Sequence, residues 1–589
     1  MKSFYYIFSI LFVLSCFTSC KDKESAADVV ILYTTDVHGN VLPYDFTLQK
    51  ANKSSLANAS TLIKEVRNEY GNDLILIDDG DLFQGTPAMY YYNYFATDQN
   101  HVVSKIANYL GYNGIVVGNH DLDAGENISD KIKKEINMPL FGANSIDTRI
   151  NMAMFRPYKI FERHGFRIAV IGFITPETGD QIPKNLIPHL AYGSMTDYAR
   201  RWIREIKNME KPDYIIGVVH SGIKSFDYIH ANGDTIKDGI TQVIENVEGF
   251  DLILFGHDHE VYNDDYVTEN SDTVRLLQPA AHGAEIGRVD IHLSRNEDKS
   301  VTKVTETQRI SLEDYPIDED YMKEFGNVID TVNNFLDRPL GCLTEELDMV
   351  GTLYKQTNSM DLVHQIQLET TGAEISLASA LSTFRNIPAG PITLRTLFTL
   401  YKYDNQVHKI WMNGYELKKF LEYGCDRQFG VMGSNHNHLL AFKYDSNGKI
   451  TYGRFGPDLV VPQYNYTSAA GINYEIDVRK PLGDRITILS MADGSPFEYN
   501  RQYTVAISSY QAAGGGGFIS RGLEWSKEDI AYHTLSISKH TIIYLMAKYL
   551  EELQNVTPKA NGHWKVIPEA WALNAGREDS DLLIPYISK

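Results

Sequence analysis

Short, nearly continuous apolar runs recur through the first half of the chain, and polar residues follow each of them. Consecutive apolar positions, without alternation, are typical of strands that are covered on both faces. Amphipathic stretches with helical spacing, such as 60–70 and 198–209, separate several of the runs. This pattern predicts an α/β domain in which sheets are packed between helices. The predicted strands are Val29–Tyr33, Leu74–Ile77, Ile115–Val117, Ile168–Ile171, Tyr214–Val219 and Leu252–Phe255.

The pattern changes after about residue 310, and the length of the chain also indicates more than one domain. A chain of 589 residues is too long for a single hydrophobic core. Apolar residues at helical spacing between Tyr321 and Leu336 predict a helix that links two domains. We therefore divide the chain into a first domain at 28–310, a linking helix at 311–339, a second domain at 340–556 and a tail at 557–589.

The first twenty residues have the features of a targeting segment. Lys2 is followed by an apolar stretch, 4–17, that is short for a membrane span but suits a secretory signal. Cys20 ends the segment, and charged residues begin directly after it. We predict a bacterial lipoprotein signal peptide with the lipid on Cys20; Cys16, or cleavage without a lipid, is the alternative. The protein would then be exported and anchored to the outer membrane, facing either the periplasm or the cell surface.

Charge and cysteine usage exclude some kinds of partner and site. The formal net charge is −21, which argues against binding a nucleic-acid polymer, because that requires clustered Lys and Arg. A small phosphorylated ligand is still compatible, since bound cations dominate the local field. Cys342 and Cys425 are the cysteines beyond the leader, and no Cys-x-x-Cys pair indicates a thiolate metal site. Whether these two cysteines pair stays open.

Residues that can bind a metal follow five of the apolar runs. The carboxyl ends of parallel strands meet at one edge of a sheet, so these residues are expected to converge. Singly, each has an ordinary structural explanation, but together they favour a two-metal hydrolase site. Mixed imidazole and carboxylate donors suit Zn, Mn, Fe or Co, with Mg also compatible, and Asp81 is the natural bridge. The set is Asp36, His38, Asp81, Asn119, His220, His257 and His259.

His120 and Asp123 are spaced for a further task beside these ligands. His120 can donate a proton to the phosphate or to the leaving group. Asp123 can orient the imidazole of His120 and keep it protonated. The two residues are therefore our candidate catalytic pair.

The motifs together resemble the signature of the calcineurin-like metallophosphoesterases, and the second domain makes the chain similar to the bacterial 5′-nucleotidase family. This resemblance implies a four-layer αββα catalytic domain followed by an α/β nucleotide-recognition domain. It also implies that Asp36, His38, Asp81 and His259 hold one ion, and that Asp81, Asn119, His220 and His257 hold the other. The motifs are Asp36-Val37-His38, Gly80-Asp81, Gly118-Asn119-His120-Asp121, His220 and Gly256-His257-Asp258-His259.

The resemblance also implies where a nucleotide would bind in the second domain. Tyr403 and Tyr510 match the aromatic residues that stack on the base, and stacking contributes ~1–3 kcal/mol with tolerance for different bases. Asn405 belongs to the same segment as Tyr403, and Gly515 and Gly516 belong to the glycine run after Tyr510. Arg385 matches an arginine that contacts the nucleotide.

One departure bears on the substrate. The 5′-nucleotidases usually carry an Asp in the glycine-rich loop, where it holds ribose hydroxyls; this chain has Gly516. The loop, and segments 35–45 and 472–478, are more similar to the 2′,3′-cyclic-nucleotide 2′-phosphodiesterase/3′-nucleotidases. However, Tyr510-Gln511-Ala512 stands where that branch has Tyr-Arg-Ala.

We therefore predict hydrolysis of 2′,3′-cyclic nucleotides to 3′-nucleotides, and of 3′-nucleotides to nucleoside and phosphate. Two alternatives stay open. One is a 5′-nucleotidase or UDP-sugar hydrolase on the same scaffold. The other is a surface lipoprotein that binds nucleotides without catalysis.

Overall fold

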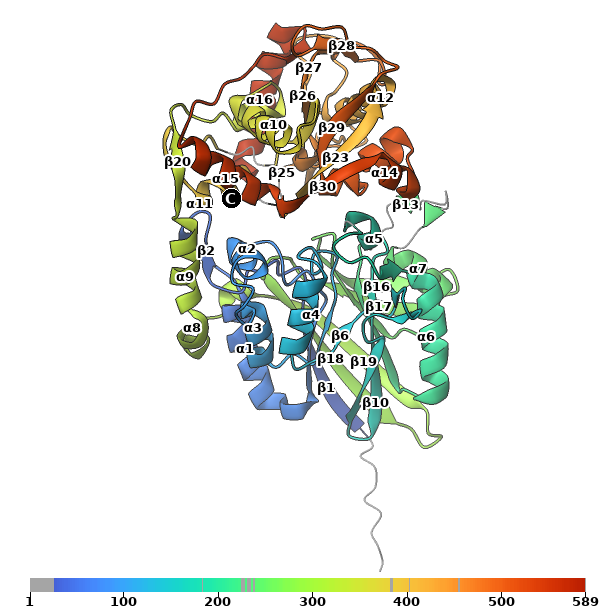
Figure 1. Cartoon of the computed structure of the whole chain (residues 1–589). Helices are drawn as coiled ribbons and strands as arrows, with labels where there is room; N and C mark the ends of the chain where they lie inside the picture. The colour runs from blue at the N-terminus through green and yellow to red at the C-terminus, as the bar shows by residue number, and fades with distance from the viewer. Residues whose placement is uncertain are drawn as a thin grey trace, which may run out of the picture.

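The chain folds into two domains, shown one above the other in Figure 1. This computed structural model describes residues 26–182, 184–223, 228–229, 235–236, 239–381, 385–401, 403–453 and 456–587. The predicted leader, with Cys16 and Cys20, lies outside the described residues. Within the described ranges, none of the helices combines the length and the apolar character needed to cross a membrane.

The first domain contains two six-stranded sheets. The six predicted strands are confirmed; three of them pair in parallel in each sheet. One sheet has the order β19 (Val301–Ser311), β18 (Glu285–Arg295), β1 (Ala26–Thr34), β4 (Leu74–Asp78), β5 (Gly114–Val116) and β6 (Leu140–Phe141). The other has the order β16 (Tyr262–Val267), β17 (Thr273–Gln278), β15 (Leu252–Phe255), β12 (Tyr214–His220), β10 (Phe166–Ile174) and β9 (Tyr158–Arg163).

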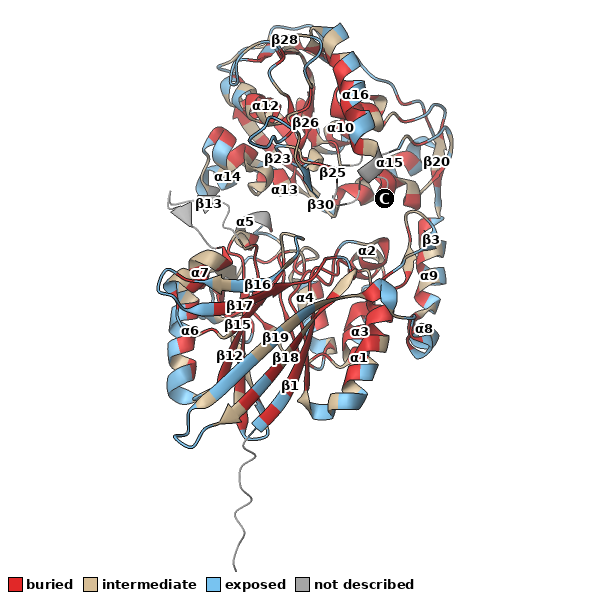
Figure 2. Ribbon diagram, turned by 180° about the vertical axis from the view of Figure 1, so that it is seen from behind, coloured by how far each residue is buried: buried red, intermediate tan, exposed pale blue. Residues whose placement is uncertain are grey.

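Apolar side chains on both faces of each sheet create the four layers. Ile31 and Ile77 of one sheet share a buried cluster with Val170 and Val218 of the other. The outer faces are covered by helices, α1 (Leu56–Tyr70) and α3 (Val102–Leu110) on one side and α6 (Met195–Met209) and α7 (Ile240–Asn246) on the other. Figure 2 shows the buried strands between their helices. The predicted αββα architecture is confirmed.

The linking segment differs from the single helix that we expected. It forms two helices, α8 (Glu319–Phe325) and α9 (Asn327–Leu336), which meet at Gly326. The apolar spacing continues through this glycine, whereas glycine itself disfavours a continuous helix. Tyr321 is buried, and its hydroxyl donates to the carbonyl of Val41 at 2.7 Å. The segment is thus packed onto the first domain.

The second domain is built around a five-stranded sheet, which two three-stranded sheets and the short pair β24 (Tyr452–Gly453) and β25 (Gly456–Pro457) accompany. The central order is β26 (Thr467–Ala470), β21 (Ile375–Ser379), β29 (Gln502–Ser508), β23 (Gln406–Asn413) and β30 (Thr534–Thr541). The three-stranded sheets are β22 (Gly390–Thr393), β20 (Pro339–Leu343) and β31 (Asn555–Val556), and β28 (Ile486–Met491), β27 (Ile472–Asp477) and β32 (Trp564–Ile567). The main helices are α10 (Asn358–Thr371), α12 (Gly414–Gln428), α15 (Ile542–Leu553) and α16 (Glu569–Ile587).

The segment that we expected to be a separate tail belongs to this second domain. β32 pairs in parallel with β27, and Ala572 and Ala575 of α16 are buried in the same core as Phe420. The mixed composition gave no sign of this role, because a four-residue strand and a helix interrupted by the polar run 576–581 give weak periodic signals. Cys342 and Cys425 are both free, which answers the open question about their pairing.

Direct contacts fix how the two domains face each other. Tyr90, in α2 (Pro87–Tyr94), places its hydroxyl 2.9 Å from the hydroxyl of Thr541. Its ring packs edge-on against Phe398 of α11 (Leu394–Leu400), with 5.2 Å between ring centroids. The guanidinium of Arg395 donates to the carbonyl of Phe46. These contacts hold the second domain over the polar loops of the first.

Candidate two-metal active site

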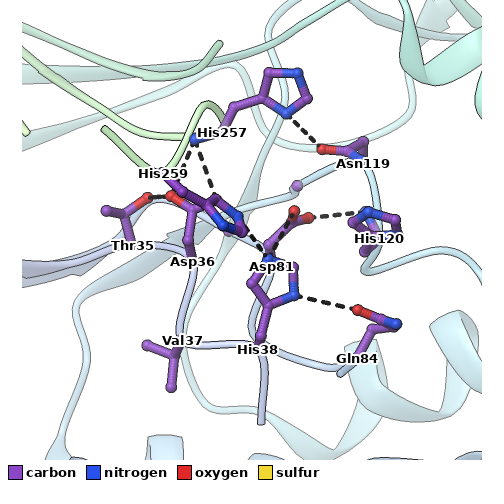
Figure 3. A network of polar contacts seen from close by, with 12 residues as sticks. Thr35, Asp36, Val37, His38, Asp81, Gln84, Asn119, His120, His257 and His259 are labelled. Carbon is purple, nitrogen blue, oxygen red and sulfur yellow. Dashed lines mark hydrogen bonds and ion pairs between the residues drawn. The ribbon is translucent and has the colours of Figure 1, made fainter. Parts of the chain in front are cut away.

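The seven candidate ligands converge where the parallel strands of both sheets end. Asp36, His38, Asp81 and Asn119 follow strands β1, β4 and β5 of one sheet, while His220, His257 and His259 end or follow strands β12 and β15 of the other. Nε2 of His38 lies 3.0 Å from Nε2 of His259, and Nε2 of His220 lies 3.0 Å from Oδ1 of Asn119. In Figure 3, the side chains of His38 and His259 lie beside Asp81, and that of Asn119 contacts His257.

The donors form two groups that can each hold a metal ion. The first is Asp36, His38 and His259, and the second is Asp81, His220 and His257. Oδ1 of Asn119 lies 2.8 Å from Nδ1 of His257, so its amide extends the second group. Oδ2 of Asp81 is 3.6 Å from Nε2 of His38 and 3.3 Å from Nε2 of His220. One carboxylate therefore faces both groups, and the donor types fit two divalent cations.

The backbone at five of these seven ligands is in the left-handed region. Residues other than glycine rarely adopt this backbone conformation, and each residue that does so costs about 1–3 kcal/mol of stability. Two hydrogen bonds hold the first loop: the Asp36 amide donates to Gly80 at 3.0 Å and the His38 amide to Asp81 at 2.8 Å. The strain turns several side chains toward one point. The φ angles are 48° at Asp36, 46° at His38, 54° at Asp81, 81° at His257 and 59° at His259.

The loops after β4 and β5 touch closely beside Asp81. A Cβ at Gly80 would lie 2.5 Å from the amide nitrogen of Gly118, so no side chain fits there. The buried carboxylate of Asp121 accepts hydrogen bonds from the amides of both loops, at 3.0 Å from Asp81 and 2.8 Å from Gly118. Asp121 is thus a positioning residue. We gave it no role from sequence, although it stands directly after His120 in the motif.

Burial and neighbouring groups set protonation states that suit metal binding. Burial lowers the pKa of His38 to about 4 and the pKa of His257 to about 3, so both imidazoles are neutral at pH 7. Burial alone would raise the pKa of Asp36, but the hydrogen bond from His259 and the charge of His220 lower it. Gln84, whose Oε1 is 3.2 Å from Nδ1 of His38, orients that ring.

The candidate catalytic pair lies at the edge of the two metal groups. Nδ1 of His120 is 2.8 Å from Oδ2 of Asp123, and the ring of His120 is 5.7 Å from that of His38. Burial disfavours a charged imidazole, but the negative charges of Asp123 and Asp81 raise the pKa of His120 to about 9. His120 is therefore protonated at neutral pH, as a general acid requires.

The structure adds a histidine that we missed. The ring of His282 lies 5.4 Å from that of His38 and 5.0 Å from that of His259, so it stands beside the first metal group. Its amide donates to the carbonyl of Asp36 at 2.7 Å, and its φ is 61°. His282 follows β17, which is parallel to β15. The strand-end rule would have found it if that strand had been recognised.

In the second domain, a cluster of three tyrosines lies where we predicted nucleotide binding. The rings of Tyr403 and Tyr464 are 6.3 Å apart, and burial raises the pKa of Tyr403 to about 12. Burial, together with Tyr464 and Tyr403, raises the pKa of Tyr510. The ring of Tyr510 covers Gly515, where a Cβ would be 2.4 Å from Cε2 of the tyrosine. Tyr403, Tyr464 and Tyr510 are called the tyrosine cluster below.

Two other predicted substrate residues differ in their surroundings. The amide of Asn405 donates to the hydroxyl of Tyr401 at 3.1 Å and accepts from Ser509 at 3.3 Å, which ties together the segments that carry Tyr403 and Tyr510. Arg385 is exposed. Among the residues that the structure describes, no hydrogen bond or ion pair connects Arg385 to the tyrosine cluster, and its contact with the nucleotide stays a prediction.

The tyrosine cluster and the metal groups face each other across the domain interface. Burial and the negative charge of Asp123 raise the pKa of Asp404, next to Tyr403, to about 8, and His120 opposes this rise. The pKa of Tyr510 likewise responds to Glu177 of the first domain. Side chains of both domains therefore share one electrostatic environment. Sequence alone did not single out Asp404 or Glu177.

Comparison with known proteins agrees with this arrangement. The sequence model of the calcineurin-like phosphoesterase family matches residues 29–261, and the family model of the 5′-nucleotidase C-terminal domain matches residues 340–521. The chain belongs to the 5′-nucleotidase family. In this family, a 2′,3′-cyclic-nucleotide 2′-phosphodiesterase/3′-nucleotidase from Yersinia enterocolitica is 24% identical over 95% of this chain and 91% of its own.

Two further relatives extend the comparison within the 5′-nucleotidase family. A 5′-nucleotidase from Vibrio parahaemolyticus is 23% identical over 84% of this chain and 86% of its own. A crystal structure from Staphylococcus aureus, assigned as a 5′-nucleotidase, superposes with a TM-score of 0.73 at 18% identity, covering 92% of this chain and 100% of that one. The last similarity concerns the fold, which the two proteins share over both domains.

Proposed function

We propose that this protein is a metal-dependent nucleotide phosphohydrolase whose substrates are 2′,3′-cyclic nucleotides and 3′-nucleotides. The observation that carries the proposal is the juxtaposition of two metal-binding groups and the His120–Asp123 pair with the tyrosine cluster of the other domain. The chemistry and a surface for an aromatic base thus lie on opposite sides of one interface. The similarity to the 2′,3′-cyclic-nucleotide 2′-phosphodiesterase/3′-nucleotidase of Yersinia enterocolitica supports the choice of substrates.

The ligand assignment follows the two groups described above. Asp36, His38, Asp81 and His259 would hold one ion; Asp81, Asn119, His220 and His257 would hold the other. When bound, the two ions supply Lewis-acid activation of water and neutralise charge on the phosphoester oxygens. Zn, Mn, Fe or Co suits these donors, and Mg is compatible.

The chain's own residues handle the proton of the leaving group. Asp123 accepts a hydrogen bond from Nδ1 of His120, which leaves Nε2 to donate to the departing sugar oxygen. The negative charge of Asp123 keeps this imidazole protonated until the P–O bond breaks. Proton donation of this kind contributes about 10²–10⁴-fold in rate.

The second domain positions the nucleoside. We propose that Tyr403 and Tyr510 stack on the base, that Asn405 braces their segments, and that Gly515 and Gly516 allow the ligand to approach the loop backbone. Stacking explains recognition without strong base preference, because every base has a π-face. Our prediction that Arg385 contacts the nucleotide rests on the family resemblance alone.

A substrate comparison tests the proposal against its rivals. Full-length protein supplied with Mn²⁺ or Zn²⁺ is assayed with 2′,3′-cyclic AMP, 3′-AMP and 5′-AMP. We expect turnover of the first two to exceed that of 5′-AMP. Hydrolysis of 5′-AMP alone would establish the 5′-nucleotidase alternative, which the similarity to the Vibrio parahaemolyticus 5′-nucleotidase supports. Metal-loaded protein that binds nucleotides without hydrolysing any would establish the non-catalytic alternative.

We also propose that the protein is exported and held at the outer membrane by a lipid on Cys20. Charged residues follow Cys20 directly, as they would at the start of a mature lipoprotein. In cells, Cys20→Ser is expected to move the protein from the membrane fraction to the soluble fraction, whereas Cys16→Ser is expected to leave it bound. The reverse result would identify Cys16 as the lipid acceptor.

A further inference from the structure

A short polar segment without an assigned role adjoins the tyrosine cluster. Gln463–Asn465 forms a single 3₁₀ turn just before β26. Tyr464 contributes its ring to the tyrosine cluster, 6.3 Å from that of Tyr403. The next residue, Asn465, borders the glycine loop, because a Cβ at Gly516 would lie 2.7 Å from its Oδ1. Tyr464 and Asn465 therefore connect the tyrosine cluster to the glycine loop, residues 514–517.

The side chain of Asn465 is buried but its carbonyl has no partner. Asn465 is only 8% exposed, and its Oδ1 makes no hydrogen bond with any part of the protein that the structure describes. The backbone is satisfied, since the Asn465 amide donates to Pro462 at 3.0 Å and its carbonyl accepts from Thr467 at 3.4 Å. Native proteins rarely leave a buried amide oxygen unpaired, so this one calls for an explanation such as a ligand.

The glycine loop cannot supply a polar side chain at this place itself. Gly516 has a φ of 71°, and a Cβ there would collide with Asn465 and with the ring of Phe518 at 2.9 Å. The carbonyl of Gly516 accepts a hydrogen bond from Arg427 at 2.8 Å, which fixes the loop. Asn465 therefore presents a side-chain amide at this corner of the tyrosine cluster.

We propose that Asn465 is a specificity-determining residue that accepts a hydrogen bond from the nucleoside held by the tyrosine cluster. This inference rests on the proposed function, because it presupposes that a nucleotide binds at that cluster. The partner is a donor of the nucleoside, either a sugar hydroxyl or an exocyclic amine of the base. Recognition by one hydrogen bond discriminates well, because a ligand that lacks the donor leaves the amide unpaired.

Steady-state kinetics of Asn465→Leu test the proposal in the metal-loaded full chain. Leucine has a similar size but no acceptor. The substrates are 3′-AMP, purine riboside 3′-phosphate, which lacks the amine, and p-nitrophenyl phosphate, which lacks a nucleoside. Dividing kcat/KM for each nucleotide by that for p-nitrophenyl phosphate corrects for folding and metal loading. We expect this ratio to fall about tenfold for 3′-AMP, the loss of roughly one hydrogen bond, through a higher KM.

The second nucleotide identifies the donor. An equal loss with purine riboside 3′-phosphate assigns the bond to a sugar hydroxyl, and a loss confined to 3′-AMP assigns it to the amine. Asn465→Asp, which keeps an acceptor, is expected to retain more of the ratio than leucine does. Asn447→Ala, an exposed residue of the same domain, is the matched control and is expected to change nothing.

The outcomes separate this inference from the function on which it rests. A ratio within twofold of wild type for both nucleotides overturns the role of Asn465 and leaves the proposed function intact. Wild-type protein that hydrolyses p-nitrophenyl phosphate but no nucleotide refutes the proposed function, and the inference falls with it. If the leucine variant loses turnover of every substrate, Asn465→Ala is judged by the same ratio and the same limits.

Discussion

The metal groups and the tyrosine cluster are built in different ways. The metal groups lie within one domain, and strained backbone, close loop contacts and the Asp121 carboxylate determine the direction of each ligand. The tyrosine cluster is assembled from three separate segments of the other domain, with an unpaired amide oxygen at its edge. The backbone thus fixes the positions of the metal ligands, whereas the choice of substrate depends on individual side chains. Substitutions in the first region should abolish function, and substitutions in the second should redirect it.

The strongest test of this contrast is Asp81→Asn. The variant weakens the one carboxylate that faces both metal groups, so kcat/KM is expected to fall on the order of 10³-fold or more for every substrate. Metal analysis of the purified protein should show fewer than two ions per chain. Asp298→Asn, in an exposed turn, is the control. Two bound ions with near-normal turnover would contradict the bridging role.

His120→Ala should slow catalysis while leaving the metals in place. Because His120 donates to the leaving group, kcat is expected to fall by about 10²-fold for 3′-AMP. The loss should be much smaller for p-nitrophenyl phosphate, whose leaving group needs no proton. Equal losses with both substrates would show that His120 acts elsewhere, for example on the phosphate.

Tyr510→Ala sharpens the other side of the comparison. Removing one stacking surface is expected to raise KM for 3′-AMP and 3′-UMP about tenfold, in line with ~1–3 kcal/mol per stacked base. Metal content and turnover of p-nitrophenyl phosphate report on the first domain and serve as the reference. Exposed Tyr452→Ala is the matched tyrosine control. An effect on kcat alone would argue against base stacking.

The smallest expected effect concerns the contact between the two regions. Tyr90→Phe removes only the hydroxyl that meets Thr541, and should lower the free energy that holds the domains together by about 1 kcal/mol. Small-angle scattering would detect a larger share of extended molecules, with metal content unchanged. A scattering curve identical to that of the wild type would mean that apolar packing, including Phe398, is sufficient.

The sequence was most informative where function follows directly from strand order. The apolar runs located six strands, and the residues after them proved to meet at one point, because parallel strands share a direction. What it could not reveal depends on contacts between distant segments. Asn465 borders Gly516 and Asp404 faces Asp123 only because the domains are folded and docked. His282 was missed because its strand was not recognised, and β32 and α16 because their composition gives little periodicity.

Each metal group takes donors from both sheets of the first domain. Asp36 and His38 are on one sheet and His259 on the other, and Asp81 stands opposite His220 and His257. Bound ions would therefore cross-link the sandwich, and neither sheet could load them before the two are docked. Retention of metal after dialysis would then indicate that the first domain is completely folded. A chelator would destabilise this domain, so its melting temperature would fall along with its activity.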